Sequence, residues 1–223
     1  MKPSKKELFY NTFAPKWEKH INNAETKKRL KVVFLDLLKG VSLKNKKFLE
    51  IGCGLGYFSL EALNRAAKVT AVDVGKNLVA ITKNRVRKGK FIVASASELP
   101  FRNNSFDIVL CTEVIEHVDN QKAAFKEMFR VLKKGGYLVL TTPNKLFKPL
   151  FDFLSLTKTR VYKGNEKWFF YKEIKGIFKK RKADIVKEVY FNFIYPNKIT
   201  DRFEKIHFLK YLMINQAYLI MKN

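Results

Sequence analysis

The chain has 223 residues, with 45 Lys and Arg against 20 Asp and Glu, a formal charge of +25. This length suits one domain with its own core, and a content of 47% hydrophobic residues excludes an intrinsically disordered chain. The two cysteines, Cys53 and Cys111, form no CxxC pair, so we expect buried thiols and no metal site.

The positive charge predicts attraction to polyanions, either an anionic membrane surface or a nucleic acid. A second explanation stays open, because Lys, Asn, Ile and Phe share AT-rich codons and genome composition alone can enrich them. The first residues, Met1 to Lys6, are followed by no apolar signal core. No stretch approaches the ~18 apolar residues of a membrane span. We therefore expect a cytoplasmic protein, with peripheral membrane attachment as the alternative.

Residues 1–45 are expected to form a helical lid. Ser4 and Glu7 have the spacing of a capping box, and an apolar stripe follows at Phe9, Phe13, Trp17 and Ile21. A second helix is predicted over residues 25–39, ending at Gly40.

From residue 46 onward, short apolar runs alternate with helical stretches. The expected strands are Phe48–Ile51, Val69–Val72, Phe91–Ala94, Ile108–Cys111 and Tyr137–Thr141. The expected helices between them are Phe58–Arg65, Lys76–Arg87 and Gln121–Leu132. This alternation predicts a doubly wound α/β fold, a parallel sheet with helices on both faces. Gly135 and Gly136 are expected to end the last of these helices.

The alternation breaks after Pro143. Residues 145–182 hold 12 Lys and Arg against three Asp and Glu, and Phe147, Leu150, Phe151 and Leu154 recur at helical spacing. An apolar face with basic flanks predicts an acceptor lid that touches an anionic membrane. Aromatic residues 168–171 leave RNA binding open, and a helix packed on the sheet is a further alternative. A helix over 172–182, a strand over 185–191, a loop region around 196–208 and a last strand over 217–221 complete the prediction.

The strongest motif is the glycine-rich turn after the first strand. Gly52, Gly54 and Gly56 follow Glu50 in a GxGxG spacing, and Tyr57 occupies the third glycine position of the dinucleotide fingerprint GxGxxG. The spacing therefore disfavours a nicotinamide dehydrogenase. Asp73 ends the second strand, where a carboxylate can accept hydrogen bonds from both hydroxyls of a ribose.

The segment from Phe48 to Asn144 resembles class I S-adenosylmethionine-dependent methyltransferases, and in particular the ubiquinone- and menaquinone-biosynthesis family. Three further runs carry the resemblance: Leu99–Asp107, Glu113–Val118 and Leu132–Leu138. The resemblance implies a mostly parallel, Rossmann-like sheet of seven strands, the last one antiparallel. It also implies a cofactor-binding domain over residues 46–223, with an acceptor-lid insertion near 145–182.

The resemblance also implies a binding set for S-adenosylmethionine. Glu50 and the glycines hold its methionine part, Asp73 its ribose, and Ser95 stands where the family has an Asp that contacts the adenine. His117 is a weak candidate for a catalytic base, since the family keeps it with unrelated acceptors. The full expected set is Glu50, Gly52, Cys53, Gly54, Gly56, Asp73, Val74, Ser95, Ala96, Ser97, Thr112 and Glu113, with Tyr10 from the lid.

These patterns predict O-methylation of a small, lipid-like or quinone-type acceptor. Two alternatives stay open, an RNA methyltransferase and a non-catalytic protein that binds S-adenosylmethionine.

Overall fold

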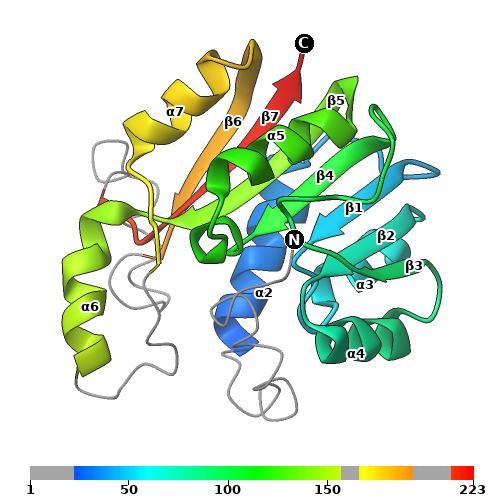
Figure 1. Cartoon of the computed structure of the whole chain (residues 1–223), viewed down its shortest axis with the longest axis horizontal. Helices are drawn as coiled ribbons and strands as arrows, with labels where there is room; N and C mark the ends of the chain where they lie inside the picture. The colour runs from blue at the N-terminus through cyan, green and yellow to red at the C-terminus, as the bar shows by residue number, and fades with distance from the viewer. Residues whose placement is uncertain (1–22, 157–165, 193–211) are drawn as a thin grey trace.

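The computed structural model describes residues 23–156, 166–192 and 212–223 (Figure 1). They contain one sheet of seven strands in the order β3-β2-β1-β4-β5-β7-β6. The strands are β1 (Lys47–Ile51), β2 (Lys68–Asp73), β3 (Lys90–Val93), β4 (Phe106–Thr112), β5 (Leu132–Pro143), β6 (Ala183–Phe191) and β7 (Asn215–Lys222). Strands β1 to β5 are parallel, and β7 runs antiparallel between β5 and β6. The expected doubly wound fold is confirmed.

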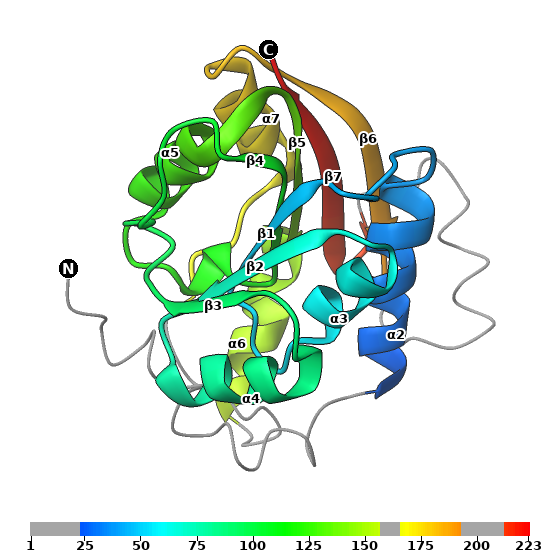
Figure 2. The same cartoon turned by 90° about the vertical axis from the view of Figure 1, so that its right-hand side faces the viewer.

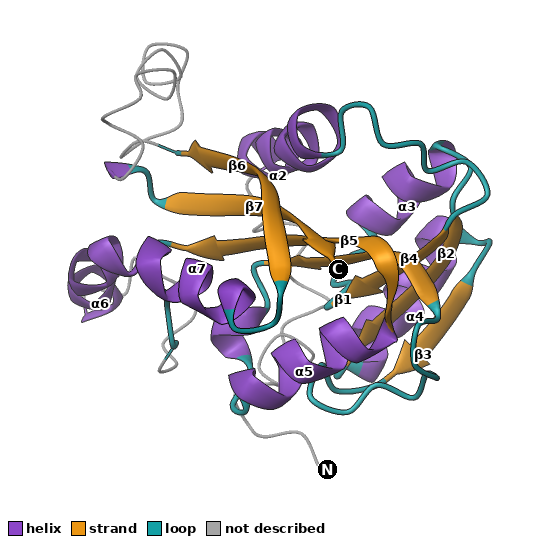
Figure 3. Cartoon of the chain, turned by 90° about the horizontal axis from the view of Figure 1, so that it is seen from above, coloured by secondary structure: helices purple, strands orange, loops and turns teal. Residues whose placement is uncertain are grey.

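Helices cover both faces of this sheet (Figures 2 and 3). On one face lie α2 (Asn23–Lys31), η1 (Val32–Leu37) and α3 (Tyr57–Asn64), with α4 (Lys76–Val86) beside α3. On the other lie α5 (Gln121–Val131) and α7 (Tyr171–Lys179). Each face has its own apolar core, so the central strands are buried on both sides and read as continuous apolar runs.

The helix expected over residues 25–39 is present but changes type midway. α2 continues as η1, a π-helical segment whose Val32, Val33, Phe34 and Leu37 are buried. Gly40 follows with a φ of +85°, a conformation that glycine adopts without strain. The apolar stripe therefore packs on the sheet as its spacing predicts.

The role expected for Gly135 and Gly136 is wrong. The helix α5 ends earlier, at Val131, and both glycines lie within β5. There the pairing with β4 shifts register between Phe106 and Ile108. A Cβ on Gly136 would come within 2.8 Å of the Asp107 carbonyl oxygen, so this glycine allows a close backbone approach inside the sheet, whereas Gly135 adopts a φ of +69°.

The described residues between 145 and 182 include two helical parts. The first contains η3 (Lys145–Phe147) and α6 (Lys148–Leu156), which lies at the edge of the molecule in Figure 1. The second is α7, which buries Ile174 and Phe178 in the core beside α5. This second part therefore covers the sheet.

Several expectations lie outside the described residues. They are the helix beginning at Ser4, Tyr10 in that lid, and the loop region around residues 196–208.

Candidate functional site

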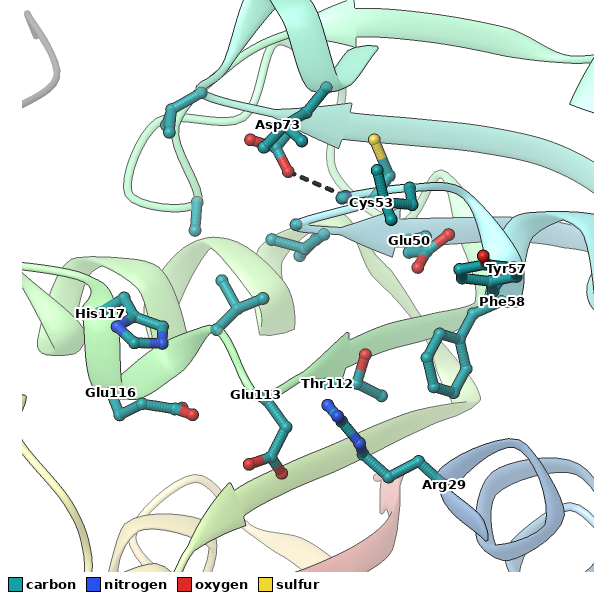
Figure 4. Close-up of a pocket in the computed structure, with 18 of the residues that line it drawn as sticks. Arg29, Glu50, Cys53, Tyr57, Phe58, Asp73, Thr112, Glu113, Glu116 and His117 are labelled. Atoms are coloured by element: carbon teal, nitrogen blue, oxygen red, sulfur yellow. Dashed lines mark hydrogen bonds between the residues drawn. The ribbon is translucent and has the colours of Figure 1, made fainter. Parts of the chain in front are cut away.

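A cavity of about 400 Å³ opens at the carboxyl ends of β1, β2 and β4. In the sheet order, β1 and β4 are neighbours whose connections leave in opposite directions, which is where open α/β sheets bind ligands. Figure 4 shows two groups of side chains around this cavity. We call the first the glycine-turn side (residues 50–58 with Asp73), and the second the carboxylate side (Glu113, Glu116, His117 and Glu166).

The glycine turn gets its shape from three left-handed backbone conformations. The φ angles are +74° at Gly52, +51° at Gly54 and +80° at Gly56, values that side-chain-bearing residues rarely adopt. A Cβ on Gly52 would lie 2.2 Å from a methyl group of Val114. The turn therefore packs directly on the loop after β4, and its backbone borders the cavity.

Asp73 is buried at the end of β2, and its carboxylate organises the turn. It accepts hydrogen bonds from the backbone N–H of Gly54 (3.1 Å) and of Gly75 (2.9 Å). Burial raises its pKa above the ordinary value, while these bonds oppose the rise. A carboxylate has about four acceptor positions, so Asp73 keeps capacity for hydroxyl groups in the cavity.

Glu50 is buried beneath the same turn. The hydroxyl of Ser59 donates to its carboxylate, and burial raises its pKa to about 8, with the negative charge of Asp73 adding to the rise. Glu50 is therefore largely protonated at neutral pH, and a cation brought into the cavity would favour its ionised form.

Most of the other predicted binding residues line the cavity. Those that do are Cys53, Gly56, Val74, Ala96, Thr112 and Glu113. Ser95 and Ser97 are not among the lining residues. The Ser95 hydroxyl accepts a hydrogen bond from the Ser97 N–H at 3.2 Å, and the Ser97 hydroxyl donates to the Asn120 carbonyl at 3.3 Å.

On the carboxylate side, Glu113 adopts the left-handed region with a φ of +50°, which is uncommon for this residue type. Its carboxylate accepts hydrogen bonds from the Thr141 hydroxyl (2.8 Å) and the Asn215 amide (3.0 Å). Burial raises its pKa to about 7, although the positive charge of Arg29 opposes this rise. The strained loop thus holds a carboxyl group that titrates near neutral pH.

Glu116, His117 and Glu166 complete this side. Burial and the nearby Glu113 raise the pKa of Glu116 well above its ordinary value. Glu166 is buried, and its Oε1 lies 3.6 Å from Nδ1 of His117. Among the described residues, no group of His, Cys, Asp and Glu is arranged to hold a metal ion.

Several residues of the cavity wall lie outside the predicted set. Arg29 points toward it from α2 in Figure 4, and Thr26 lies one turn earlier on that helix. Glu116 lies within the run Glu113–Val118, where its spacing offered a signal. Glu166 belongs to an irregular segment, so no local pattern could place it at the cavity.

The family model of a methyltransferase domain matches residues 49–140. An uncharacterized protein of Methanocaldococcus jannaschii is 30% identical over 181 residues, 81% of this chain and 64% of its own length. A ubiquinone biosynthesis O-methyltransferase of Pelagibacter ubique is 33% identical over 109 residues, 48% of this chain and 45% of its own length. The chain thus spans less than two thirds of these curated relatives.

Solved structures share the fold. A Thermotoga maritima S-adenosylmethionine-dependent methyltransferase, described as a possible histamine N-methyltransferase, superimposes with a TM-score of 0.72 at 22% identity, covering 96% of this chain and 98% of that one. Magnesium protoporphyrin IX methyltransferase from Synechocystis, solved with bound S-adenosylhomocysteine, superimposes with a TM-score of 0.72 at 13% identity. The match covers 98% of this chain and 97% of that one.

The family match coincides with the part of the chain that builds the glycine turn, Asp73 and the loop after β4. The sequence match, the sheet order and the position of the cavity all indicate a methyltransferase fold. Residues 49–140 thus match a methyltransferase domain, and the chain shares the fold of S-adenosylmethionine-dependent methyltransferases.

Proposed function

We propose that the chain transfers a methyl group from S-adenosylmethionine to a small acceptor bound on the carboxylate side of the cavity. The observation that carries this proposal is the two-sided lining. One side is made of turn backbone that borders the cavity together with the buried carboxylate of Asp73, and the other side is made of titratable side chains. A single cavity with both sides places two ligands next to each other, as a transfer reaction requires.

The residues present fit the cofactor. Nε of Arg29 and the hydroxyl oxygen of Thr26 are buried at the cavity wall without a hydrogen-bond partner among the described residues. A buried guanidinium N–H of this kind suits a carboxylate, which the methionine part of the cofactor carries. Asp73 would bind the ribose. Glu50 would act through the turn to hold the ammonium group. Val74 and Ala96 would pack beside the adenine.

When bound, S-adenosylmethionine supplies an electrophilic methyl group on a sulfonium that leaves readily. The chain contributes binding and alignment, for which rigid positioning supplies up to ~7–11 kcal/mol of a barrier. The cavity-lining residues stand at strand ends and on a strained loop, both held by backbone hydrogen bonds such as Glu113 N–H to the Thr141 carbonyl (3.1 Å).

For the acceptor we propose O-methylation of a quinone-type molecule. The support comes from relatives that match about half of this chain and are described as ubiquinone biosynthesis O-methyltransferases. Burial raises the pKa of Glu113 to about 7 and that of Glu116 well above its ordinary value, so both groups retain a proton more readily than an exposed glutamate does. Protonated carboxyls donate hydrogen bonds, so they can bind the oxygens of such an acceptor.

We further propose that α6 contacts an anionic membrane surface that contains a hydrophobic acceptor. Leu146, Leu150 and Phe153 are exposed, with 62% of Phe153 accessible. Phe147 and Phe151, which the helical spacing also placed on the apolar face, are half-buried, and the Phe151 ring lies 5.2 Å from that of Trp168. Among the described residues, no helix is long and apolar enough to cross a membrane.

Calorimetry and labelled methyl transfer test the function. We expect S-adenosylmethionine and S-adenosylhomocysteine to bind and NAD not to bind. We then expect label to move from the cofactor into quinone-type acceptors with a free hydroxyl. Binding without transfer to small molecules, lipids or RNA would support a non-catalytic cofactor-binding protein, and transfer to RNA would support the alternative methyltransferase.

Vesicle sedimentation tests the membrane contact. Leu150→Ser combined with Phe153→Ser should abolish binding to anionic vesicles at low salt. Leu35→Ser is the matched control, since Leu35 is 52% exposed on η1. RNA binding would also fall with salt, but it should survive the double substitution. A wild-type chain that ignores anionic vesicles would contradict the membrane contact.

A further inference from the structure

His117 and Glu166 form a pair that the fold brings together from distant parts of the chain. His117 stands on η2 (Ile115–His117) after β4, with its side chain 16% exposed. Glu166 is 3% exposed, with Oε1 at 3.6 Å from Nδ1 of His117. Its other oxygen, Oε2, accepts a hydrogen bond from the indole N–H of Trp168 at 2.6 Å. Both side chains line the cavity.

Backbone and side-chain hydrogen bonds fix the segment that carries Glu166. The N–H of Lys167 donates to the Glu116 carbonyl at 3.0 Å, and the Lys167 carbonyl accepts from the Gln121 amide at 2.8 Å. Two residues later, Phe169 bridges to Asn144 at the end of β5. Glu166 therefore keeps its place relative to η2, and the pair does not depend on a loose surface contact.

We propose that Glu166 is a positioning residue for His117, and that His117 accepts the proton of the methyl acceptor through Nε2. This inference rests on the proposed methyl transfer. The carboxylate facing Nδ1 favours the tautomer that carries its proton there, which makes Nε2 the proton-accepting nitrogen. The same carboxylate stabilises the imidazolium that forms.

The step balances as a proton transfer coupled to substitution. The O–H or N–H bond of the acceptor breaks and its proton goes to Nε2 of His117. The electron pair left on the acceptor atom forms the bond to the methyl carbon, and the carbon–sulfur bond breaks with its electrons on sulfur. The imidazolium then returns its proton to solvent.

Other charged groups surround the pair. Glu116 stands beside His117 on η2, Glu113 lies on the loop before it, and Arg29 reaches the cavity from α2. Burial raises the pKa of Glu113 to about 7 and that of Glu116 well above its ordinary value, which lowers the negative charge of both groups beside His117. Glu166 is the carboxyl group whose Oε1 lies 3.6 Å from Nδ1 of His117.

Histidine NMR of the ¹⁵N-labelled chain tests the pair without any acceptor. The chain has three histidines, and His117→Gln identifies the signal that belongs to His117. In the wild type we expect the neutral ring to carry its proton on Nδ1. In Glu166→Gln, the titration of His117 should move to lower pH by about one unit, and the proton should redistribute between the nitrogens. Glu166→Asp should restore part of the shift.

Glu188→Gln is the matched control, since Glu188 pairs with Lys175 at 3.5 Å on the far strand β6. It should leave the His117 signals unchanged. S-adenosylhomocysteine binding by each variant shows that it is folded. Identical tautomer and titration in the wild type and Glu166→Gln would overturn the pairing.

Methyl transfer with catechol and histamine as acceptor probes tests the catalytic role. His117→Gln should lower kcat at least about 100-fold. Glu166→Gln should lower kcat about 10-fold with KM changed less than about threefold, and should move the acid limb of the pH profile to lower pH. A His117→Gln variant with wild-type kcat would overturn the role of His117. If neither probe accepts label, that result counts against the proposed function, while the NMR result still decides the pairing.

Discussion

The two sides of the cavity are built in different ways. The glycine-turn side comes from one continuous strand–turn–helix segment and the end of the adjacent strand β2, and backbone conformation sets its shape. The carboxylate side collects Glu113 and Glu116 from the loop after β4, and Glu166 from the segment before α7. Glu113 and Glu116 are neighbours along the chain, and tertiary packing brings Glu166 to them.

This difference separates the part of the site that binds the cofactor from the part that selects the acceptor. A backbone turn tolerates little variation, because its left-handed residues admit only glycine without strain. Side chains on loops can change without disturbing the sheet, which is how one fold serves many acceptors. We therefore expect substitutions on the glycine-turn side to act on cofactor binding, and those on the carboxylate side to act on the acceptor step.

The largest expected effect comes from Gly54→Val. Its φ of +51° disfavours a β-branched residue, and the new side chain would occupy space at the cavity. We expect cofactor affinity to fall at least about 100-fold, or about 3 kcal/mol, in calorimetry. Gly176→Ala is the control, since Gly176 lies in α7 with nothing within 4 Å of its added Cβ. Equal cofactor affinity in both variants would remove the turn from the binding site.

Asp73→Ala should weaken cofactor binding by about 1–3 kcal/mol. The change leaves ribose hydroxyls without an acceptor in a buried site, and it also removes the bond that the Gly54 N–H donates. Calorimetry with S-adenosylhomocysteine measures the loss. Asp73→Asn retains one oxygen acceptor and should fall between the wild type and the Ala variant. Wild-type affinity in Asp73→Ala would refute the ribose assignment.

Sequence reasoning reached the glycine-turn side because its signals are local. The strand, the three glycines and Asp73 lie within 25 residues of one another, and each has a physical reason for its position. The alternating strands and helices followed from hydrophobic spacing in the same way, and the antiparallel last strand followed from the resemblance. The error at Gly136 has a partly tertiary cause, since a Cβ there would lie 2.8 Å from the Asp107 carbonyl oxygen of the neighbouring strand β4.

The carboxylate side could not be predicted as a unit. Glu166 lies 49 residues beyond His117 in an irregular segment, and hydrogen bonds to the Glu116 carbonyl and to Gln121 place it. Arg29 shares its helix with an apolar stripe, and spacing alone does not show that the polar flank of that stripe borders a cavity.

Arg29→Gln tests the comparison between the glycine-turn side and the carboxylate side, because Arg29 lines the cavity that they share. We expect cofactor affinity to fall by about 1–2 kcal/mol through loss of a charged hydrogen bond to the carboxylate of the methionine part. Lys31→Gln on the same helix is the control, since the Lys31 side chain is 60% exposed and pairs with Asp36. If both variants lose equal affinity, the effect is one of overall charge and not of contact.

The pH dependence of stability tests the buried carboxyl of Glu50. Its pKa of about 8 in the folded chain lies above the ordinary value of 4.5, so the fold binds this proton more tightly than the unfolded chain does. The stabilisation is fully present below about pH 4.5 and is lost as the pH rises toward 8. Between pH 6 and 7 the loss is about 1.4 kcal/mol.

Glu50→Gln lacks this titration, and its amide oxygen can still accept from Ser59. In urea unfolding at pH 6 and at pH 7, we expect the variant to gain about 1.4 kcal/mol relative to the wild type over that interval. Parallel stability curves for the two proteins would show that Glu50 is already ionised in the folded chain.

The smallest expected effect is the loss of cofactor affinity in Glu166→Gln. Glu166 faces His117 and Trp168, and neither partner belongs to the glycine turn. We expect its affinity for S-adenosylhomocysteine to stay within about twofold of the wild type, a change below about 0.4 kcal/mol. An affinity loss as large as that of Asp73→Ala would mean that the cofactor extends across the carboxylate side. The two sides would then form one binding site, and acceptor selection would have to lie outside this cavity.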